Sequence, residues 1–228
     1  MRKLAVIING VPGSGKGMQA DLIADRFGLI HIDTGKLLRA ILSDESGEND
    51  PILKRERELN NAGILNTPSW VLATLKKKVG VTAKLGYGIV FSGSPRTLYE
   101  AEGLIPFLEK LYGRKNVYAF RLKVPFAVAA KRNSVRLVCA TCRHPLLSAF
   151  YPSNNPRNCP VCAGVLERRV DDDPLKFKTR TEEYEKRTMP ILKYMEDRGY
   201  KIISVDGTPA PYKVFEKINA SFKNGKRN

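Results

Sequence analysis

The chain has 228 residues, of which 43% are hydrophobic, and it carries a formal net charge of +16 at pH 7. This composition indicates a soluble globular protein with one α/β core and insertions, and no apolar run is long enough to span a membrane. The N-terminal residues lack a signal-peptide cleavage site, so we expect a cytoplasmic protein. The positive charge favours a polyanionic ligand, either a nucleotide or nucleic acid, without choosing between them.

A glycine-rich loop between a strand and a helix is the most informative stretch. The apolar run Lys3 to Asn9 predicts a buried parallel strand, and apolar residues at helical spacing predict a helix from Gln19 to Phe27. The intervening loop, Gly10 to Gln19, matches the phosphate-binding pattern G-x-x-x-x-G-K. Its glycines let backbone N–H groups point at one anion, and Lys16 adds a charge for the outer phosphates. Gly17 stands where the general motif has a magnesium-binding Ser or Thr.

A short strand and three helices follow. The strand is Leu29 to Ile32, after which Asp33 can cap a helix that runs through Leu42. Beyond a polar break we expect a second helix from about Ile52 to Ala62, and Pro68 begins a third helix that carries Trp70 toward the core.

The middle of the chain alternates strands with helices. Gly88 to Ser92 is predicted to be a buried strand, followed by a turn into the helix Thr97 to Leu111. Val117 to Leu122 is the next strand, and Pro125 to Arg136 is a helix that leads into a cysteine-containing module.

The end of the chain continues this alternation. We expect one long charged helix from Pro174 to Asp197, a strand from Tyr200 to Val205 and a last helix from Tyr212 to Phe222. Alternating strands and helices imply a parallel sheet with right-handed crossovers and with ligands at the carboxyl ends of the strands. The site is therefore expected near Gly10, Asp33, Ser92 and Lys123.

The four cysteines form two C-x-x-C pairs. They are Cys139, Cys142, Cys159 and Cys162. This spacing predicts a tetrathiolate site for structural Zn²⁺, and it favours that interpretation over disulfides or redox-active thiols in a reducing compartment. Because protein ligands fill all four positions, the zinc is not expected to be catalytic.

Taken in order, these motifs resemble the adenylate kinase family in its long form with a zinc-bearing lid. The resemblance covers nearly the whole chain. It rests on the loop at Gly10, Thr34-Gly35 with Arg39, Gly93-x-Pro95-Arg96-Thr97, Arg132 and Arg136 before the cysteines, Arg169-Val170-Asp171-Asp172 after them, Arg180, and Thr188-x-Pro190. It implies a P-loop three-layer α/β fold whose parallel-sheet core comprises residues 1–32, 67–136 and 174–228. A helical monophosphate-binding insertion would span 33–66, and a zinc-bound β lid 137–173.

The resemblance also implies a reaction, namely reversible phosphoryl transfer from ATP to AMP, giving two ADP, with Mg²⁺ bound to ATP. Such transfer needs alignment and charge neutralisation more than covalent help, which suits a site lined by arginines. The implied catalytic residues are Lys16, Arg96, Arg132, Arg169 and Arg180. The implied ATP site is Gly13, Ser14, Gly15, Lys16, Gly17, Met18, Arg132 and Arg136. The implied AMP site is Thr34, Gly35, Arg39, Asn66, Gly93, Arg96, Glu100, Arg169 and Arg180.

The resemblance further implies lid closure over the reacting groups and a monomer that binds neither membrane nor nucleic acid. Asp171 and Asp172 either help the lid to close, as in the family, or cap the following helix. His31 and His144 are interpreted as structural or surface residues.

Three residues depart from the family near the expected magnesium position. Met18 replaces Thr, and Lys36 and Ser92 replace carboxylates that normally steady the water shell of the metal. Asp33, where the family has Ser, is a candidate substitute. Because Mg²⁺ keeps several waters, it can remain on ATP with thin protein support. We therefore expect slower or weaker Mg²⁺-dependent turnover and not an inactive protein.

The acceptor pocket departs as well. Glu100 replaces the Gln that reads adenine, Asn66 replaces a small apolar residue, and Ser94 replaces an aromatic one. An ionised carboxylate suits the two donors of guanine better than the donor and acceptor of adenine. AMP is the first expectation and GMP the alternative acceptor.

A different class of function also fits part of the chain. A P-loop protein with a zinc ribbon and a charge of +16 could bind nucleotide or RNA with weak catalysis or none. The arginines around the cysteines match the kinase arrangement instead, and no stripe of aromatic and basic residues is visible for base stacking.

Overall fold

The computed structural model describes residues 3–44, 49–62, 64–142, 145–146, 156–168 and 174–224. Arg169, Asp171, Asp172 and His144, which the sequence singled out, lie outside these residues. Five strands form the main sheet in the order β2-β3-β1-β4-β8. They are β1 (Ala5–Asn9), β2 (Leu29–Ile32), β3 (Gly88–Phe91), β4 (Val117–Lys123) and β8 (Ile202–Asp206).

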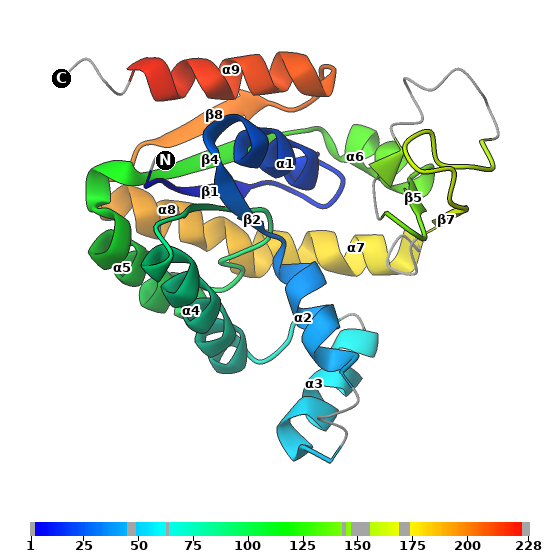
Figure 1. Ribbon diagram of the computed structural model, residues 1–228, viewed down its shortest axis with the longest axis horizontal. Coiled ribbons are helices and arrows are strands. Elements are labelled where there is room, and N and C mark those ends of the chain that lie inside the picture. The colour runs from blue at the N-terminus through cyan, green and yellow to red at the C-terminus, as the bar shows by residue number, and fades with distance from the viewer. Residues whose placement is uncertain are drawn as a thin grey trace.

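All four strand pairings in this sheet are parallel, so the carboxyl ends of the strands share one edge. The central strand β1 is completely buried, as its near-continuous apolar sequence requires. Helices cover both faces (Figure 1). One face packs against α1 (Lys16–Phe27) and α9 (Pro211–Asn224), and the other against α4 (Pro68–Lys84), α5 (Leu98–Tyr112) and α8 (Met189–Asp197). The predicted three-layer α/β fold is confirmed.

Two helices project from the core below the carboxyl edge of the sheet, α2 (Thr34–Leu42) and α3 (Pro51–Asn61) (Figure 1). Each begins at an aspartate cap, because Asp33 accepts a hydrogen bond from the Lys36 N–H and Asp50 accepts from the Ile52 N–H. This arm belongs to the predicted monophosphate-binding insertion, whose existence as a separate mobile domain stays a prediction.

A buried carboxylate ties this arm to the core. Glu56 is 0% exposed and accepts hydrogen bonds from the side chain of Asn66 at 3.0 Å and from the Thr67 N–H at 2.9 Å. Burial alone would raise the pKa of Glu56, but the hydrogen bonds from Thr67, Asn66 and Arg55 outweigh it and hold that pKa below its usual value.

A small antiparallel sheet follows α6 (Phe126–Ser134). Its strands lie in the order β6-β5-β7 and comprise Pro145–Leu146, Leu137–Cys139 and Leu166–Arg168. The helix α7 (Pro174–Glu183) leads from this region back beneath the core (Figure 1). Among the described residues, none of the helices combines the length and apolarity needed to cross a bilayer.

The long helix expected from Pro174 to Asp197 is interrupted. A π-helical turn, Tyr184–Thr188, separates α7 from α8. Pro190 has no N–H group, so the regular hydrogen-bond ladder cannot continue through it. The Thr188 hydroxyl instead donates to the Arg96 carbonyl at 2.9 Å, which anchors this turn beside the loop after β3. Such turns occur frequently at functional sites.

Candidate active site

The glycine-rich loop joins the carboxyl end of β1 to α1, which starts at Lys16, three residues earlier than the apolar spacing predicted. Gly13 has a φ of +79°, and a Cβ on it would lie 2.5 Å from the Ala129 carbonyl oxygen. Gly15 caps α1 in the left-handed conformation and supplies no side-chain acceptor for the first N–H groups of the helix. A loop of this shape therefore aims unsatisfied backbone donors and the positive end of a helix at one position.

Lys16 is held inside that loop. Its Nζ donates to the carbonyl oxygens of Gly10 at 2.6 Å and Val11 at 2.9 Å. The residue as a whole is half-buried, and its pKa is lowered to about 7. Desolvation of the ammonium group is the largest cause, the charges of Arg180, Arg96 and Arg136 add to it, and Asp33 opposes them. The loop therefore holds Lys16 in surroundings where a bound anion would favour its charged form.

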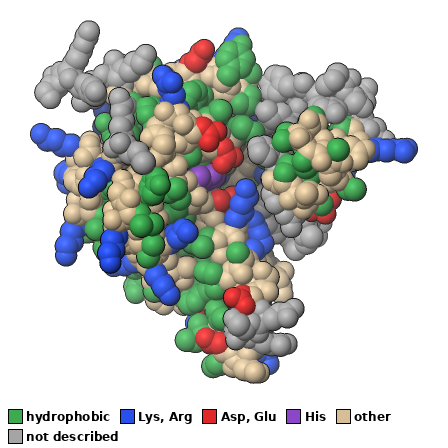
Figure 2. Space-filling view, viewed as in Figure 1, with side chains coloured by type: hydrophobic (Ala, Val, Ile, Leu, Met, Phe, Trp, Pro, Cys, Tyr) green, Lys and Arg blue, Asp and Glu red, His purple; other side chains and the backbone are tan. Residues whose placement is uncertain are grey.

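A polar hollow of about 250 Å³ opens on one side of the loop. Figure 2 shows lysine and arginine side chains scattered over the visible face, with a few of them beside the hollow. The structure brings most of the predicted acceptor-site and loop residues to this hollow: Gly13, Gly15, Lys16, Gly17, Thr34, Gly35, Arg39, Asn66, Gly93, Arg96, Glu100 and Arg180.

The sequence had not predicted the contribution of the π-helical turn and of the residue before it. Glu183, Tyr184 and Thr188 line the same hollow. A strictly α-helical expectation gave no signal for these positions, although Pro190 marks where the helix must change.

The predicted position of Lys36 also differs, because its side chain is exposed and it is not among the residues that line the hollow.

A second, more apolar pocket of about 390 Å³ lies on the other side of the loop. The predicted residues Gly13, Ser14, Gly15, Met18, Arg132 and Arg136 line it. Val128, Val135, Leu146, Pro209 and Val214 complete its apolar wall, and sequence reasoning had missed them. Val128, Leu146 and Val214 lie in α6, β6 and α9, and the other two lie in the segments that follow α6 and β8, so no local pattern could have grouped them. Gly13 and Gly15 line both pockets, which therefore meet at the phosphate-binding loop.

The predicted arginines divide between the two pockets. Arg96 and Arg180 line the polar hollow, whereas Arg132 and Arg136 line the apolar pocket. Arg132 donates to the carbonyl oxygens of Gly207 at 2.8 Å and Thr208 at 2.7 Å, in the loop between β8 and α9. Its guanidinium group is thus held against the loop after β8 while the residue lines the apolar pocket.

Hydrogen bonds fix the loop after β3. Arg96 Nε donates to the Gly93 carbonyl at 2.7 Å, and the Thr34 hydroxyl donates to the Ser94 hydroxyl at 2.8 Å. Thr34 and Ser94 are both buried. The guanidinium group of Arg96 is thereby held by the backbone of its own turn.

Two of the three unusual residues of the predicted acceptor pocket, Glu100 and Asn66, form hydrogen bonds within the protein. Glu100 is 2% exposed, and its carboxylate accepts hydrogen bonds from the Arg96 N–H at 2.9 Å and the Thr97 hydroxyl at 3.1 Å. Burial raises the pKa of Glu100, although the hydrogen bond and charge of Arg96 oppose this. Asn66 donates to both the backbone and side chain of Glu56. Both residues line the pocket while also holding its walls.

His31 lies beside the site without lining the hollow itself. It joins Ser92, which lines the hollow, to Asp21 on α1. The sequence signal for His31 was its place at the end of β2, two residues before Asp33, but nothing in the sequence indicated its partners.

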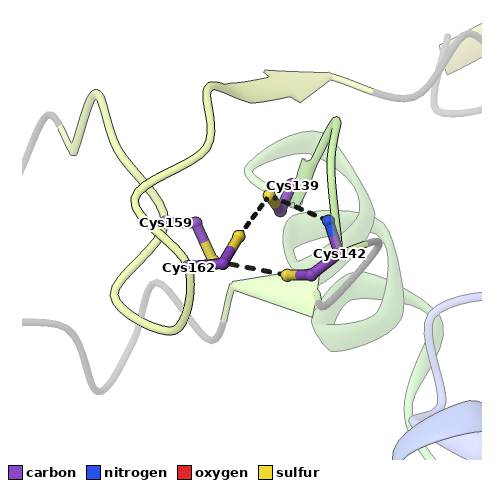
Figure 3. Close-up of side chains that lie close together, drawn as sticks. All are labelled: Cys139, Cys142, Cys159 and Cys162. Atoms are coloured by element: carbon purple, nitrogen blue, oxygen red, sulfur yellow. Dashed lines mark hydrogen bonds between the residues drawn. The ribbon is translucent and has the colours of Figure 1, made fainter.

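The four cysteines converge as their spacing predicted. Their sulfur atoms all lie within 4.8 Å of one another, with Cys139 and Cys162 at 3.4 Å and Cys142 and Cys159 at 3.7 Å (Figure 3). A hydrogen bond from the Cys142 N–H is the largest influence that lowers the pKa of the Cys139 thiol, to about 6. This arrangement can hold a metal ion, since the thiolate is the ligating form.

A phosphate loop at the carboxyl end of the central strand, an arginine-lined hollow on one side and an apolar pocket on the other define the class of the protein. They are the parts of a P-loop kinase that transfers phosphate from ATP to a small acceptor.

Comparison with known proteins narrows that class. The family model described as adenylate kinase matches residues 8–200. Adenylate kinase from Clostridium botulinum strain Langeland is 32% identical over 217 residues, which cover 95% of this chain and 97% of that protein. The adenylate kinase of Magnetococcus marinus is also 32% identical, over 95% of this chain and 99% of that protein. The adenylate kinase of Paracoccus denitrificans is 33% identical, over 89% of this chain and 89% of that protein. The chain belongs to the adenylate kinase family and is an ATP:nucleoside-monophosphate phosphotransferase.

Proposed function

We propose that the chain catalyses the reversible transfer of the γ-phosphoryl group from ATP to AMP, giving two ADP. The observation that carries this proposal is the meeting of the two pockets at Gly13 and Gly15, beside Lys16. The apolar pocket suits the base of ATP, and the arginine-lined hollow suits a monophosphate. A phosphoryl group held at the loop then lies between donor and acceptor, which is what in-line transfer requires.

The residues have the following roles in the proposal. The amides of Gly13 to Gly17 and the ammonium of Lys16 hold the ATP phosphates, with Ser14 and Met18 on the side of the base. Arg39 and Arg96 bind the phosphate of AMP, because a guanidinium fork matches two phosphate oxygens. Thr34, Gly35, Asn66, Gly93 and Glu100 shape the acceptor pocket. Arg180 neutralises the transferring group.

Arg132 and Arg136 act from the ATP side. On closure Arg132 would exchange its two carbonyl acceptors for phosphate oxygens, a stronger pairing of opposite charges. Arg169, in the segment before α7, is proposed to join them. Closure of the insertion at 33–66 and of the lid at 137–173 over the core at 1–32, 67–136 and 174–228 would exclude water and so suppress hydrolysis of ATP.

Two metals belong to the proposal. Mg²⁺ enters bound to ATP and spreads the negative charge of the phosphates. Zn²⁺ is proposed at Cys139, Cys142, Cys159 and Cys162. Sulfur atoms around a tetrahedral zinc with bonds of about 2.3 Å lie about 3.8 Å apart, close to the separations of 3.4 and 3.7 Å observed here. This site would stabilise the lid and take no part in chemistry. Four thiols reserved for a metal suit a reducing compartment, so we propose a cytoplasmic monomer.

A coupled assay tests the proposal. Purified protein with ATP and each nucleoside monophosphate in turn, with Mg²⁺ or with EDTA, should form ADP fastest with AMP and only when Mg²⁺ is present. Lys77→Met, on the exposed face of α4, is the matched control for Lys16→Met. ATP binding without any ADP formation would favour a regulatory nucleotide-binding protein. A salt-dependent gel shift with RNA together with absent transfer would favour the RNA-binding alternative.

GMP is the second candidate acceptor because Glu100, a carboxylate, lines the acceptor pocket. AMP remains first, since the Glu100 carboxylate already accepts from Arg96 and Thr97. The same panel separates the two, because a GMP enzyme would show a higher kcat/KM with GMP than with AMP.

A further inference from the structure

Three polar side chains from different elements form a line that ends in the polar hollow. Asp21 lies on α1, His31 on β2, and Ser92 directly after β3, the strand that pairs with β2. Asp21 Oδ1 is 2.6 Å from His31 Nδ1, and His31 Nε2 is 2.6 Å from Ser92 Oγ. The His31 side chain is only 13% exposed, so its two ring nitrogens are committed to these partners.

The hydrogen-bonding capacity of the three groups determines which atom donates in each of the two hydrogen bonds. An ionised carboxylate can only accept hydrogen bonds, so His31 carries its proton on Nδ1. The Nε2 of a neutral imidazole is then an acceptor and takes the hydroxyl hydrogen of Ser92. The Ser92 hydrogen therefore points away from the hollow, and the lone pairs of its oxygen remain available on the other side.

The hollow is otherwise rich in donors. Lys16, Arg39, Arg96 and Arg180 line it, and each of them can only donate hydrogen bonds. Phosphate oxygens suit these donors, but the waters bound to a Mg²⁺ ion need acceptors. The acceptors of its lining include Asp33, Ser92, Glu100 and Glu183, and one Asp33 oxygen already accepts from the Lys36 N–H at 3.0 Å while the Glu100 carboxylate accepts from Arg96 and Thr97. A serine whose hydrogen is held elsewhere presents only acceptor lone pairs to the hollow, whereas a freely rotating hydroxyl could also turn its hydrogen toward it.

We propose that Asp21 and His31 are positioning residues that hold Ser92 Oγ as a hydrogen-bond acceptor for the water shell of the Mg²⁺ ion that arrives with ATP. The arrangement does part of the work of a carboxylate at this position. This proposal rests on the proposed function in one respect, namely that the ligand of the site is a magnesium-bound nucleoside triphosphate.

Nucleotide binding without turnover tests this proposal. Isothermal titration with the non-hydrolysable analogue AMP-PNP, in Mg²⁺ and in EDTA, gives the gain in affinity that the metal provides. Ser92→Ala and His31→Phe should each reduce that gain about 3- to 10-fold, the range for one lost hydrogen bond, and leave the affinity in EDTA unchanged. The double variant should lose no more than either single variant, because both changes remove the same acceptor. Additive losses, or equal losses in EDTA, would overturn the proposal.

Two further measurements distinguish the loss of this hydrogen bond from a folding defect in the variants. Asp21→Asn keeps the shape of the side chain but no longer fixes the imidazole proton, so it should reduce the metal-dependent gain. Asp25→Asn, one turn along α1 and exposed, is the matched control and should not. Nitrogen-15 NMR of the wild-type protein, with the signal assigned from His31→Phe, should show the proton on Nδ1 alone. A proton on Nε2 would reverse the direction of the line and refute the proposal.

The outcomes also separate this proposal from the proposed function. If the wild-type protein transfers no phosphate but shows the metal-dependent gain and its loss in the variants, the inference stands and the reaction assignment fails. If it converts ATP and AMP to ADP while the variants bind like wild type, the reaction assignment stands and the positioning role fails.

Discussion

The two pockets that meet at the phosphate loop are built in different ways. The pocket proposed for ATP is lined by glycines of the loop and by apolar side chains such as Val128 and Val214, together with Arg132 and Arg136. The acceptor side depends on charged and polar side chains such as Arg96, Ser92 and Glu100, each held by its own hydrogen bonds. Backbone geometry tolerates exchange of side chains, whereas a pocket made of side chains changes with each substitution. The departures from the family accordingly concentrate on the acceptor and metal side.

The largest effect is expected from removing Lys16, the one charged side chain of the phosphate loop, which tests whether backbone groups alone can hold the phosphates. Lys16→Met should lower kcat by about 10²- to 10³-fold, the range for loss of one preorganised charge at a transition state. Circular dichroism and thermal unfolding should match wild type, as should the activity of Lys77→Met. Near-normal turnover by Lys16→Met would show that the backbone amides alone hold the phosphates.

Arg96→Lys sharpens the contrast between the two sides. Lysine keeps the charge but loses the fork that binds two phosphate oxygens, and hydrogen bonds between charged groups contribute about 1.5–3 kcal/mol. We expect kcat/KM for AMP to fall about 10- to 100-fold, which corresponds to about 1.4–2.7 kcal/mol and covers most of that energy range. The affinity for ATP, measured by titration without AMP, should stay constant. An equal loss for both nucleotides would show that Arg96 is not confined to the acceptor side.

Proton uptake tests the electrostatics of the loop. The pKa of Lys16 lies at about 7 in the free protein, so most of the group is neutral at pH 8. Bound phosphates favour the charged form of Lys16 and raise its pKa. At pH 8 the binding of ATP should therefore be accompanied by uptake of up to about 0.9 proton by Lys16. For the same reason the affinity for ATP should fall as the pH rises above 7. Titration calorimetry in two buffers of different ionisation enthalpy measures the uptake. Lys16→Met should abolish it, and uptake that persists in this variant would assign the proton to another group.

Metal removal tests the third region, the cysteine cluster. Wild-type protein should contain about one zinc per chain, and Cys139→Ser should lose it and unfold at least about 5 °C earlier, since each kcal/mol shifts the Tm of a chain of this size by about 2–4 °C. Elemental analysis and calorimetry give the two values. ATP affinity of the core should change little. Unchanged thermal unfolding after metal loss would argue against a structural role.

The smallest expected effect comes from Ser92→Asp. A carboxylate is a better acceptor for the waters of Mg²⁺ than a serine, so turnover at limiting Mg²⁺ should rise about 2- to 10-fold, with little change at saturating Mg²⁺. Initial rates over a series of Mg²⁺ concentrations measure it. Identical magnesium dependence in both proteins would refute the view that the metal support is thin at this position.

Much of the fold and of the donor side could be predicted because the signals are local. The strand, loop and helix around Lys16 follow from apolar spacing and glycines within 25 residues, from Lys3 to Phe27. The cysteine pairs likewise predicted their own convergence. The π-helical turn at Tyr184 was missed, since its cause combines Pro190 with an anchor on Arg96, 92 residues away from Thr188 in the sequence.

The amino-acid sequence by itself determined the class of this protein, because a phosphate loop needs only a strand, a helix and glycines between them. Only the tertiary structure decided how the unusual residues are used. His31 and Ser92 are 61 residues apart in the chain, and the pairing of β2 with β3 together with the packing of α1 brings Asp21, His31 and Ser92 into line. Likewise, Arg132 finds its carbonyl acceptors 75 residues away. Such side-chain partnerships depend on which elements lie side by side, and no local pattern records that.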